Sequence, residues 1–181
     1  MSLRLLAADG TLAAWAPASP PKVFFLVVGE GARARAVAAA ARGALAFLGY
    51  EPAAGRGSPD LSVALGPTTG EDLPYSAELH YLCLKTHPRK PLALTREGLA
   101  SARAELSALK AHARSLSGVT LEPSSRGVTG YLHRFREALS RDLDFPEALS
   151  CVWDGLRPGA LSPGSRAALL RAALPALGLD E

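Results

Sequence analysis

The chain has 181 residues, a hydrophobic content of 48% and a formal net charge of +3. This length suits one domain, or two small domains that share a core, and so many apolar residues exclude a largely disordered chain. Outside an alanine-rich segment, the apolar runs are too short for a membrane-spanning helix of about 20 residues, and no signal peptide is visible, so we expect a cytoplasmic protein.

The first part of the chain predicts a small α/β layer. Two short runs, residues 3–7 and 11–15, flank an Asp-Gly pair, which is a signal for a β-hairpin. Residues 23–28 form a continuous apolar run rich in β-formers, which predicts a strand buried on both faces, as in a parallel sheet. The alanine-rich segment 32–48 favours a helix, and Gly49 is expected to end it.

The expected boundary of this layer follows. Residues 51–60 are rich in Gly, Pro, Ala and Ser and predict a loop, whereas residues 61–65 alternate as a strand does. Residues 66–74 predict a linker. We therefore expect a truncated Rossmann-like α/β segment over residues 1–74 and a second unit, a synthetase-type helical bundle on the resemblance given below, over residues 75–181.

Everything beyond this linker predicts helices. One helix over residues 76–85 precedes a second that Thr95 caps, whose apolar residues are spaced 3-4-3-4-3, as in a seam that faces partner helices. Pro146 and Pro163 stand where first helical positions are expected. Short connections between such helices predict an antiparallel bundle, so the whole fold should be α+β and mostly helical. The seam residues are Leu99, Ala102, Leu106, Leu109, Ala113 and Leu116.

A G-x-G-x-x-A motif lies between the first predicted parallel strand and its helix. Glycines let the backbone approach a phosphate, and a helix N-terminus favours an anion, so Gly29, Gly31 and Arg33 are candidate phosphate-binding residues. Glu51 follows about twenty residues later, at the spacing of a ribose-binding acid. Against nucleotide binding, Glu30 puts a negative charge where the phosphate would sit. The alternative is a plain strand-to-helix turn.

The densest basic cluster follows the predicted helix over residues 76–85. Its members, as candidate RNA-binding residues, are Lys85, Arg89, Lys90 and Arg96. Cations at such a helix end can meet backbone phosphates, and the alternative is that they serve the helix C-terminus itself. Neither the four histidines nor the two cysteines have the spacing of a metal site, so we expect no cofactor and two buried, reduced thiols.

Three segments, in order, resemble the cysteinyl-tRNA synthetase family, a class I family. The hairpin and strand over residues 3–28, with the later Phe-Leu-Gly-Tyr at 47–50, are similar to the family's start. Residues 60–66 resemble a degenerate form of the motif K-M-S-K-S-L-G. The longest segment begins at residues 80–92, which resemble R-Y-F-L-L-S-x-H-Y-R-S-P-L, and continues to residues 135–149, which resemble F-x-x-A-M-x-D-D-F-N-T-P-E-A-L. The resemblance covers nearly the whole chain and implies a shortened, degenerate paralogue.

Departures from the family imply a protein without aminoacylation activity. No His-x-Gly-His follows Gly29, and Asp60 and Val63 stand where the family's two lysines neutralise the charge of adenylate formation. Val28 occupies the place of the first zinc cysteine, so no zinc is expected. Only nine residues join Tyr50 to Asp60, where the family places most of its catalytic domain. The family's C-terminal anticodon-binding domain is also expected to be absent.

We therefore expect a synthetase-related binding protein that contacts tRNA or an aminoacyl-tRNA synthetase. Two alternatives stay open: a nucleotide-binding enzyme that uses the Gly29-Glu30-Gly31 turn, and a protein–protein interaction module. A continuous basic groove on the bundle would favour RNA binding, a ligand at the glycine turn would favour the enzyme, and an exposed apolar patch would favour the interaction module.

Overall fold

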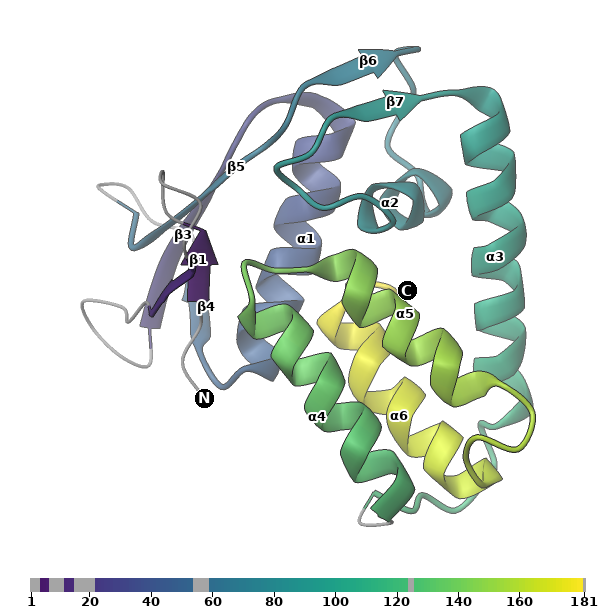
Figure 1. The fold of residues 1–181 in the computed structure, drawn as a ribbon. Helices are drawn as coiled ribbons and strands as arrows, with labels where there is room; N and C mark the ends of the chain where they lie inside the picture. Colours follow the sequence, from purple (N-terminus) through teal and green to yellow (C-terminus); the bar gives the residue numbers. More distant parts are fainter. Residues whose placement is uncertain (1–3, 7–11, 15–21, 54–58, 124–125, 181) are drawn as a thin grey trace.

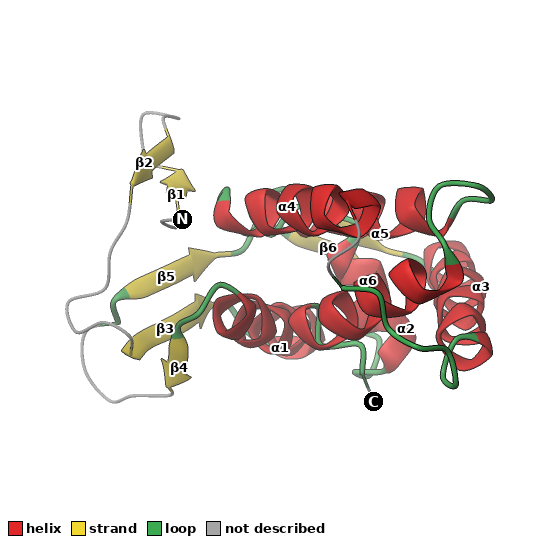
Figure 2. Cartoon of the chain, turned by 90° about the horizontal axis from the view of Figure 1, so that it is seen from below, coloured by secondary structure: helices red, strands yellow, loops and turns green. Residues whose placement is uncertain are grey.

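The computed structural model describes residues 4–6, 12–14, 22–53, 59–123 and 126–180. Strands β1 to β5 gather at one end of the molecule, and helices make up most of the rest, together with the strands β6 and β7 (Figure 1 and Figure 2), which confirms a mostly helical α+β fold. The strands are β1 Arg4–Leu6, β2 Leu12–Ala14, β3 Lys22–Val28, β4 Glu51–Ala53, β5 Leu61–Ala64, β6 Thr68–Gly70 and β7 Leu92–Leu94. The helices are α1 Gly31–Phe47, α2 Ala77–Leu84, α3 Arg96–Ser115, α4 Arg126–Ser140, α5 Phe145–Leu156 and α6 Pro163–Ala176.

A parallel three-stranded sheet has the order β4-β3-β5. Residues 22–24 of β3 pair with β4 on one edge, and residues 25–28 pair with β5 on the opposite edge. Helix α1 connects β3 to β4 and packs against both strands. The strands predicted over residues 23–28 and 61–65 and the helix between them are therefore confirmed. Strands β1 and β2 pair antiparallel, as the predicted hairpin requires, although its turn lies outside the described residues.

The prediction that β3 is buried on both faces is wrong. One set of alternating side chains faces α1 and the core, but Phe24, Leu26 and Val28 on the other face are 40%, 51% and 51% exposed. Ser62 and Ala64 of β5, which share this face by register, are exposed as well. We call these five residues the bare face. Within the described residues, the fold covers this parallel sheet on one side only.

Three short strands lie where the sequence predicted other structure. Strand β4 lies in the predicted loop over residues 51–60, β6 in the predicted linker over residues 66–74, and β7 in the half predicted as helical. Strands β6 and β7 pair in parallel, with Thr68 opposite Leu92. Three-residue strands are too short to show a hydrophobic period, so these predictions were wrong. The division of the chain at residue 74 stays a prediction.

The helix boundaries follow the caps that the sequence contains. Thr95 accepts a hydrogen bond from the Gly98 N–H at the start of α3, and Ser162 accepts one from the Ser165 N–H at the start of α6. Gly49 ends α1 with a φ of 96°, in the left-handed region that glycine adopts most easily. The predicted cap of α3, the predicted start of α6 at Pro163 and the predicted end of α1 are therefore confirmed.

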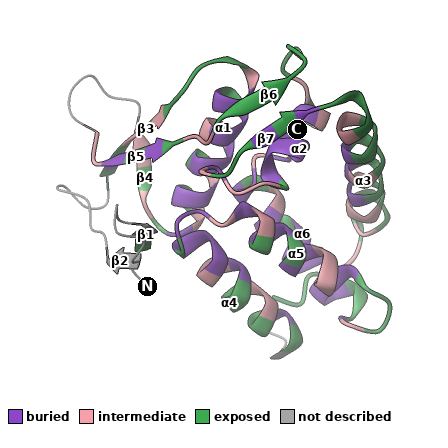
Figure 3. Cartoon of the chain, turned by 45° about the horizontal axis from the view of Figure 1, so that its top comes forward, coloured by how far each residue is buried: buried purple, intermediate pink, exposed green. Residues whose placement is uncertain are grey.

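One continuous apolar core joins the sheet, α1 and the other helices, whose mutually facing sides are buried (Figure 3). In the predicted seam of α3, Ala102, Leu106 and Leu109 are at most 5% exposed, and the three flanking seam residues are partly buried. Helices α1 and α6 approach closely because Gly43 has no side chain: a Cβ there would lie 2.3 Å from the Pro175 carbonyl oxygen.

Helices α4 and α5 are joined by a turn with an uncommon backbone. Asp142 and Leu143 have φ values of 53° and 55°, a left-handed conformation that costs non-glycine residues about 1–2 kcal/mol each. The Asp142 N–H donates to the Arg4 carbonyl oxygen of β1 at 2.6 Å. The Asp142 carboxylate accepts from Arg89 Nε at 2.7 Å and from Arg89 Nη2 at 2.9 Å. Partners distant in sequence therefore hold a turn that the local sequence disfavours.

Candidate functional site

The glycine turn after β3 is exposed at the start of α1. Gly29 and Gly31 have φ values of 153° and 82°, which only glycine adopts easily. Glu30 is the N-cap residue of α1, but its side chain accepts no hydrogen bond from the helix. The first N–H groups of α1 therefore lack a side-chain cap. Anion binding by Gly29 and Gly31 stays a prediction.

Arg33 is 3% exposed, and both of its terminal nitrogens already donate hydrogen bonds to protein oxygens. Burial lowers the pKa of this guanidinium from its ordinary value. The guanidinium joins the segment after β5 to the segment before β7, which is a structural role. Nη1 donates to the carbonyl oxygens of Gly66 (2.8 Å) and Pro67 (3.2 Å) and to Thr68 Oγ1 (3.2 Å), and Nη2 donates to the carbonyl oxygens of Pro88 (3.0 Å) and Lys90 (2.7 Å).

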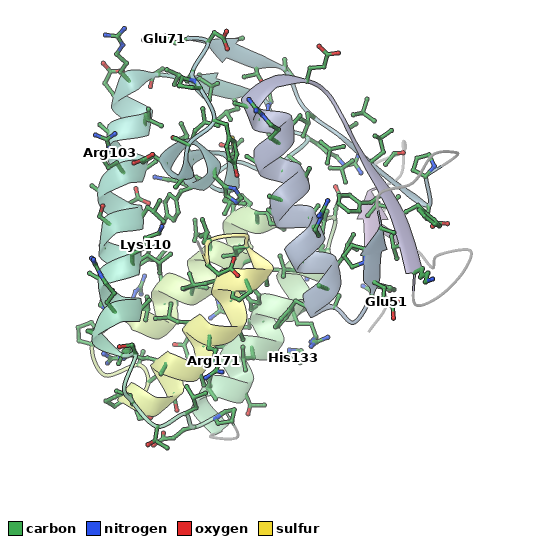
Figure 4. All side chains as sticks on the ribbon, turned by 180° about the vertical axis from the view of Figure 1, so that it is seen from behind. Glu51, Glu71, Arg103, Lys110, His133 and Arg171 are labelled. Atoms are coloured by element: carbon green, nitrogen blue, oxygen red, sulfur yellow. The ribbon has the colours of Figure 1, made fainter. Side chains whose placement is uncertain are left out.

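The inference from spacing that Glu51 lies near the glycine turn is wrong. Glu51 stands opposite Lys22 at the start of β3, whereas the turn follows Val28 at the other end. At about 3.3 Å per residue, six residues of strand separate them by about 20 Å. Figure 4 shows Glu51 at the far end of the sheet. A dinucleotide spanning both features is therefore not supported by the register.

Asp60 and Val63, which the sequence resemblance places at the family's two lysines, both have structural contacts. Asp60 Oδ2 accepts a hydrogen bond from the Phe24 N–H at 2.9 Å, and the Asp60 N–H donates to the Phe24 carbonyl oxygen at 2.8 Å. Val63 is 4% exposed and belongs to the core. Asp60 thus extends the pairing of β3 and β5, and neither residue supplies positive charge.

The predicted basic cluster is largely paired with carboxylates. Of its four members, only the exposed Lys90 has no carboxylate partner in the part of the chain that the structure describes. Paired cations attract phosphate less strongly, because each is already partly neutralised. RNA binding at this cluster stays a prediction. The three pairs are Lys85 Nζ–Glu105 Oε1 at 2.5 Å, Arg89 Nε–Asp142 Oδ2 at 2.7 Å and Arg96 Nε–Glu71 Oε2 at 3.0 Å.

Glu105 connects Lys85 to the buried Tyr81, because its carboxylate accepts hydrogen bonds from both side chains. Burial alone would raise the pKa of Glu105, but hydrogen bonds from Lys85 and Ser101 outweigh it and hold that pKa below its ordinary value. Tyr81 donates to Glu105 Oε2 at 3.3 Å and accepts from Trp153 Nε1 at 2.8 Å. Burial raises the pKa of Tyr81 to about 12, so this hydroxyl stays protonated. The network connects α2, α3 and α5.

A groove of about 550 Å³ lies between β3 and the exposed side of α1. Arg35 and Arg42, two exposed arginines of α1, are part of its lining, and Glu30 is the one acid that lines it. Neither arginine pairs with a carboxylate among the described residues, although Arg35 lies 5.6 Å from the centre of the Tyr75 ring. The groove beside β3 therefore carries a net positive charge on its α1 side.

Sequence reasoning did not single out this groove or the bare face. The signal present was Arg35 and Arg42, seven residues apart and thus on one side of an alanine-rich helix. A second signal was the single predicted helix for two parallel strands, since covering both faces of such a sheet requires helices on both sides.

The two cysteines are buried and free, as predicted. Burial raises the pKa of both Cys83 and Cys151 to about 11. Among the described residues, no three His, Cys, Asp or Glu side chains are grouped so that they could hold a metal ion, and no helix is long and apolar enough to cross a bilayer. The absence of zinc stays a prediction.

Comparison with known proteins connects the chain to one enzyme family. No protein-family profile matches it. Over 95 residues, or 51% of the chain, it is 36% identical to the cysteine–tRNA ligase of Parvibaculum lavamentivorans, and the match spans 20% of that ligase's length. Over about half of its own residues, the chain is therefore similar to a cysteinyl-tRNA synthetase, of which it spans about a fifth.

Proposed function

We propose that this chain is a synthetase-related binding protein that lacks aminoacylation activity and contacts another protein through the bare face of its sheet. An aminoacyl-tRNA synthetase is the first candidate partner. The observation that supports this proposal is the exposure of Phe24, Leu26 and Val28, at 40–51%, on a parallel sheet. Parallel sheets are normally covered on both faces. Contiguous exposed apolar surface commonly marks an interaction site.

The ancestry of the fold supports the same proposal. The β3-α1-β4 unit has parallel strands joined through a helix, which suits a remnant of a Rossmann-like layer. Helices α4, α5 and α6 are joined by connections of four and six residues, which suits an antiparallel, synthetase-type bundle. A layer reduced to one covering helix leaves a sheet face that a partner protein can cover.

The absence of catalysis is supported by the groups at the matched positions. Asp60 and Val63 offer an anion and a buried apolar side chain where adenylate formation needs cations. Cysteine-dependent exchange of pyrophosphate into ATP tests this part directly. We expect no exchange above a heat-inactivated control, and exchange that requires cysteine would show that the chain is an active synthetase.

Binding to tRNA is the alternative, and the pairing of Lys85, Arg89 and Arg96 with carboxylates makes it the weaker one. A tRNA that binds through this cluster would have to break or share these pairs. The decisive measurement therefore compares protein and RNA partners in one experiment.

Affinity purification from the native host, with protein and RNA both sequenced, tests the proposed function. Leu26→Lys places a charge on the bare face, and Leu121→Lys makes the same change at an exposed leucine that the structure places in the α3–α4 connection. We expect Leu26→Lys to lose a protein that wild type and Leu121→Lys retain. If all partners survive Leu26→Lys, the bare face is not the interaction surface. If tRNA is recovered and lost on Lys85→Ala and Lys90→Ala, the RNA alternative holds.

A further inference from the structure

Among the described residues, which leave out 54–58 after β4, the edge of β3 that faces β4 is only partly paired. Strand β4 has three residues and its register ends with Phe24 opposite Ala53, so beyond the Phe25 N–H no strand of the described residues covers residues 25–28 on that edge. The carbonyl oxygens of Phe24 and Val28 accept hydrogen bonds from the β5 side. Because successive residues of a strand direct their backbone groups to opposite edges, Phe25 and Val27 direct theirs to the β4 side. The register Phe24 opposite Ala53 uses the Phe25 N–H for β4, so the Phe25 carbonyl oxygen and both backbone groups of Val27 face the open part of the edge. An open edge is a template for another strand.

The surroundings of this edge suit an extended chain with negative charge. The groove beside it is bounded by Phe25 and Val27 on β3 and by Arg35 and Arg42 on α1, with Glu30 near the glycine turn. Two arginines that have no carboxylate partner among the described residues, against one acid, give a net positive border. Arg35 and Arg42 are about 10 Å apart along the helix axis, at 1.5 Å per residue. Acidic side chains two or four residues apart share one face of an extended strand and span about 7 or 13 Å, which brackets this separation.

A second copy of this chain is a poor occupant for the same edge. Two identical edges pair about a two-fold axis, which brings the same residues of both copies together. Arg35 and Arg42 of one copy would then approach those of the other on the same side of the joined sheet. Like charges at such a contact oppose the assembly. The occupant that suits the charges is a different protein.

We infer that residues 25–28 of β3 accept an extended segment of a partner protein, which adds as a strand at the open edge and directs acidic side chains to Arg35 and Arg42. This inference rests on the proposed function and specifies the form of the partner. Backbone hydrogen bonds to Phe25 and Val27 supply affinity, and the two arginines select for acidic residues. The added strand extends the sheet over the groove, so apolar side chains of the partner reach the lining of α1.

Selection from a library of random twelve-residue peptides displayed on phage tests this inference in vitro, using the whole chain as target. We expect enriched peptides to carry Asp or Glu two or four residues apart, flanked by apolar residues. A fluorescein-labelled synthetic copy should lose at least about tenfold in affinity for the Arg35→Glu/Arg42→Glu variant and should bind more weakly as salt increases. The matched control is Arg114→Glu/Arg171→Glu, which reverses two exposed arginines elsewhere; Figure 4 shows Arg171 on α6, away from the sheet.

Strand addition has its own readout, which does not depend on the folding of a variant. Two versions of the peptide are N-methylated at every second residue, one version at the odd positions and the other at the even positions. If the peptide adds to β3, one version lacks the N–H groups that face the edge and does not bind, while the other version keeps them and binds. If the two methylated peptides lost affinity equally, strand addition would be wrong. If the unmethylated peptide bound the Arg35→Glu/Arg42→Glu variant as tightly as wild type, the selection for acidic residues would be wrong.

The two proposals fail in different ways. If no peptide is enriched, yet Leu26→Lys loses a protein in the host, the strand-addition inference is wrong and the proposed interaction surface stands. If peptides are enriched with the expected pattern, yet Leu26→Lys keeps every partner, the edge binds strands as inferred and the proposed use of the bare face is wrong.

Discussion

Replacing Arg33 by methionine removes every hydrogen bond that this guanidinium donates while keeping a long side chain in α1. Of its five acceptors, the Pro88 carbonyl oxygen is bonded in a fully buried setting and the other four in partly buried ones. A buried acceptor left without a donor costs about 1–3 kcal/mol. Water can reach the partly buried acceptors, so these add less.

The change also brings a gain, because Arg33 Nε is buried without a partner among the described residues and methionine has no polar atom there. Balancing these effects, we expect Arg33→Met to lower the free energy of unfolding by about 2–4 kcal/mol. Arg33→Lys should fall between wild type and Arg33→Met, because one ammonium has three donors and cannot reach both segments as the planar guanidinium does.

Urea unfolding followed by far-ultraviolet circular dichroism measures this change. Arg42→Met on the exposed side of the same helix is the control and should change the free energy of unfolding by no more than about 0.5 kcal/mol. If Arg33→Met were as stable as this control, Arg33 would not hold the two segments, and its guanidinium would be free for a ligand as the sequence predicted.

Four further outcomes are expected. Leu106→Ala should cost about 2–5 kcal/mol of unfolding free energy, since Leu106 is 5% exposed; a urea-unfolding change below about 0.5 kcal/mol would contradict the seam. The lowered pKa of Glu105 means that its ionised form stabilises the fold above the pKa of about 4.3 in the unfolded chain and that this stability is lost as pH falls further. Wild type should therefore lose more stability than Glu105→Gln between about pH 5 and 3, and parallel pH profiles would refute the contribution. With pKa values of about 11, Cys83 and Cys151 should be about one part in a thousand thiolate at pH 8. Ellman's reagent should then detect both thiols only after unfolding, and rapid native reaction of either would contradict their burial. Dialysed protein should carry less than about one zinc per ten chains by elemental analysis, and a stoichiometric ion would reveal a site that sequence and fold both miss.

The parts of the fold that depend on local sequence could be predicted. Thr95 and Ser162 cap their helices through hydrogen bonds to residues three positions later, which is information contained in a few neighbouring letters. Strand β4 could not be found in this way. It contains Pro52 and has three residues, and it exists because β3 lies beside it.

The candidate sites show the same division. Lys85, Arg89 and Arg96 are close in sequence and therefore predicted a basic cluster. Their carboxylate partners are 20, 53 and 25 residues away, and no local pattern indicates them. The exposure of Leu26 could not be predicted for a similar reason. A continuous apolar strand indicates that covering both of its faces is favourable, but it does not indicate which element, of this chain or of a partner, covers each face.

The left-handed pair Asp142 and Leu143 has a consequence for the order of folding. A short turn between two helices normally lets them dock early, because the contacts are local. Here the turn is disfavoured in isolation and is held by Arg89 and by Arg4, from outside the two helices. An excised peptide of residues 126–156 should therefore form helix without the native hairpin. In the whole chain, α4 and α5 should dock only after β1 and the segment before β7 have reached their native positions. The two helices, although adjacent in sequence, should therefore adopt their native packing late in folding.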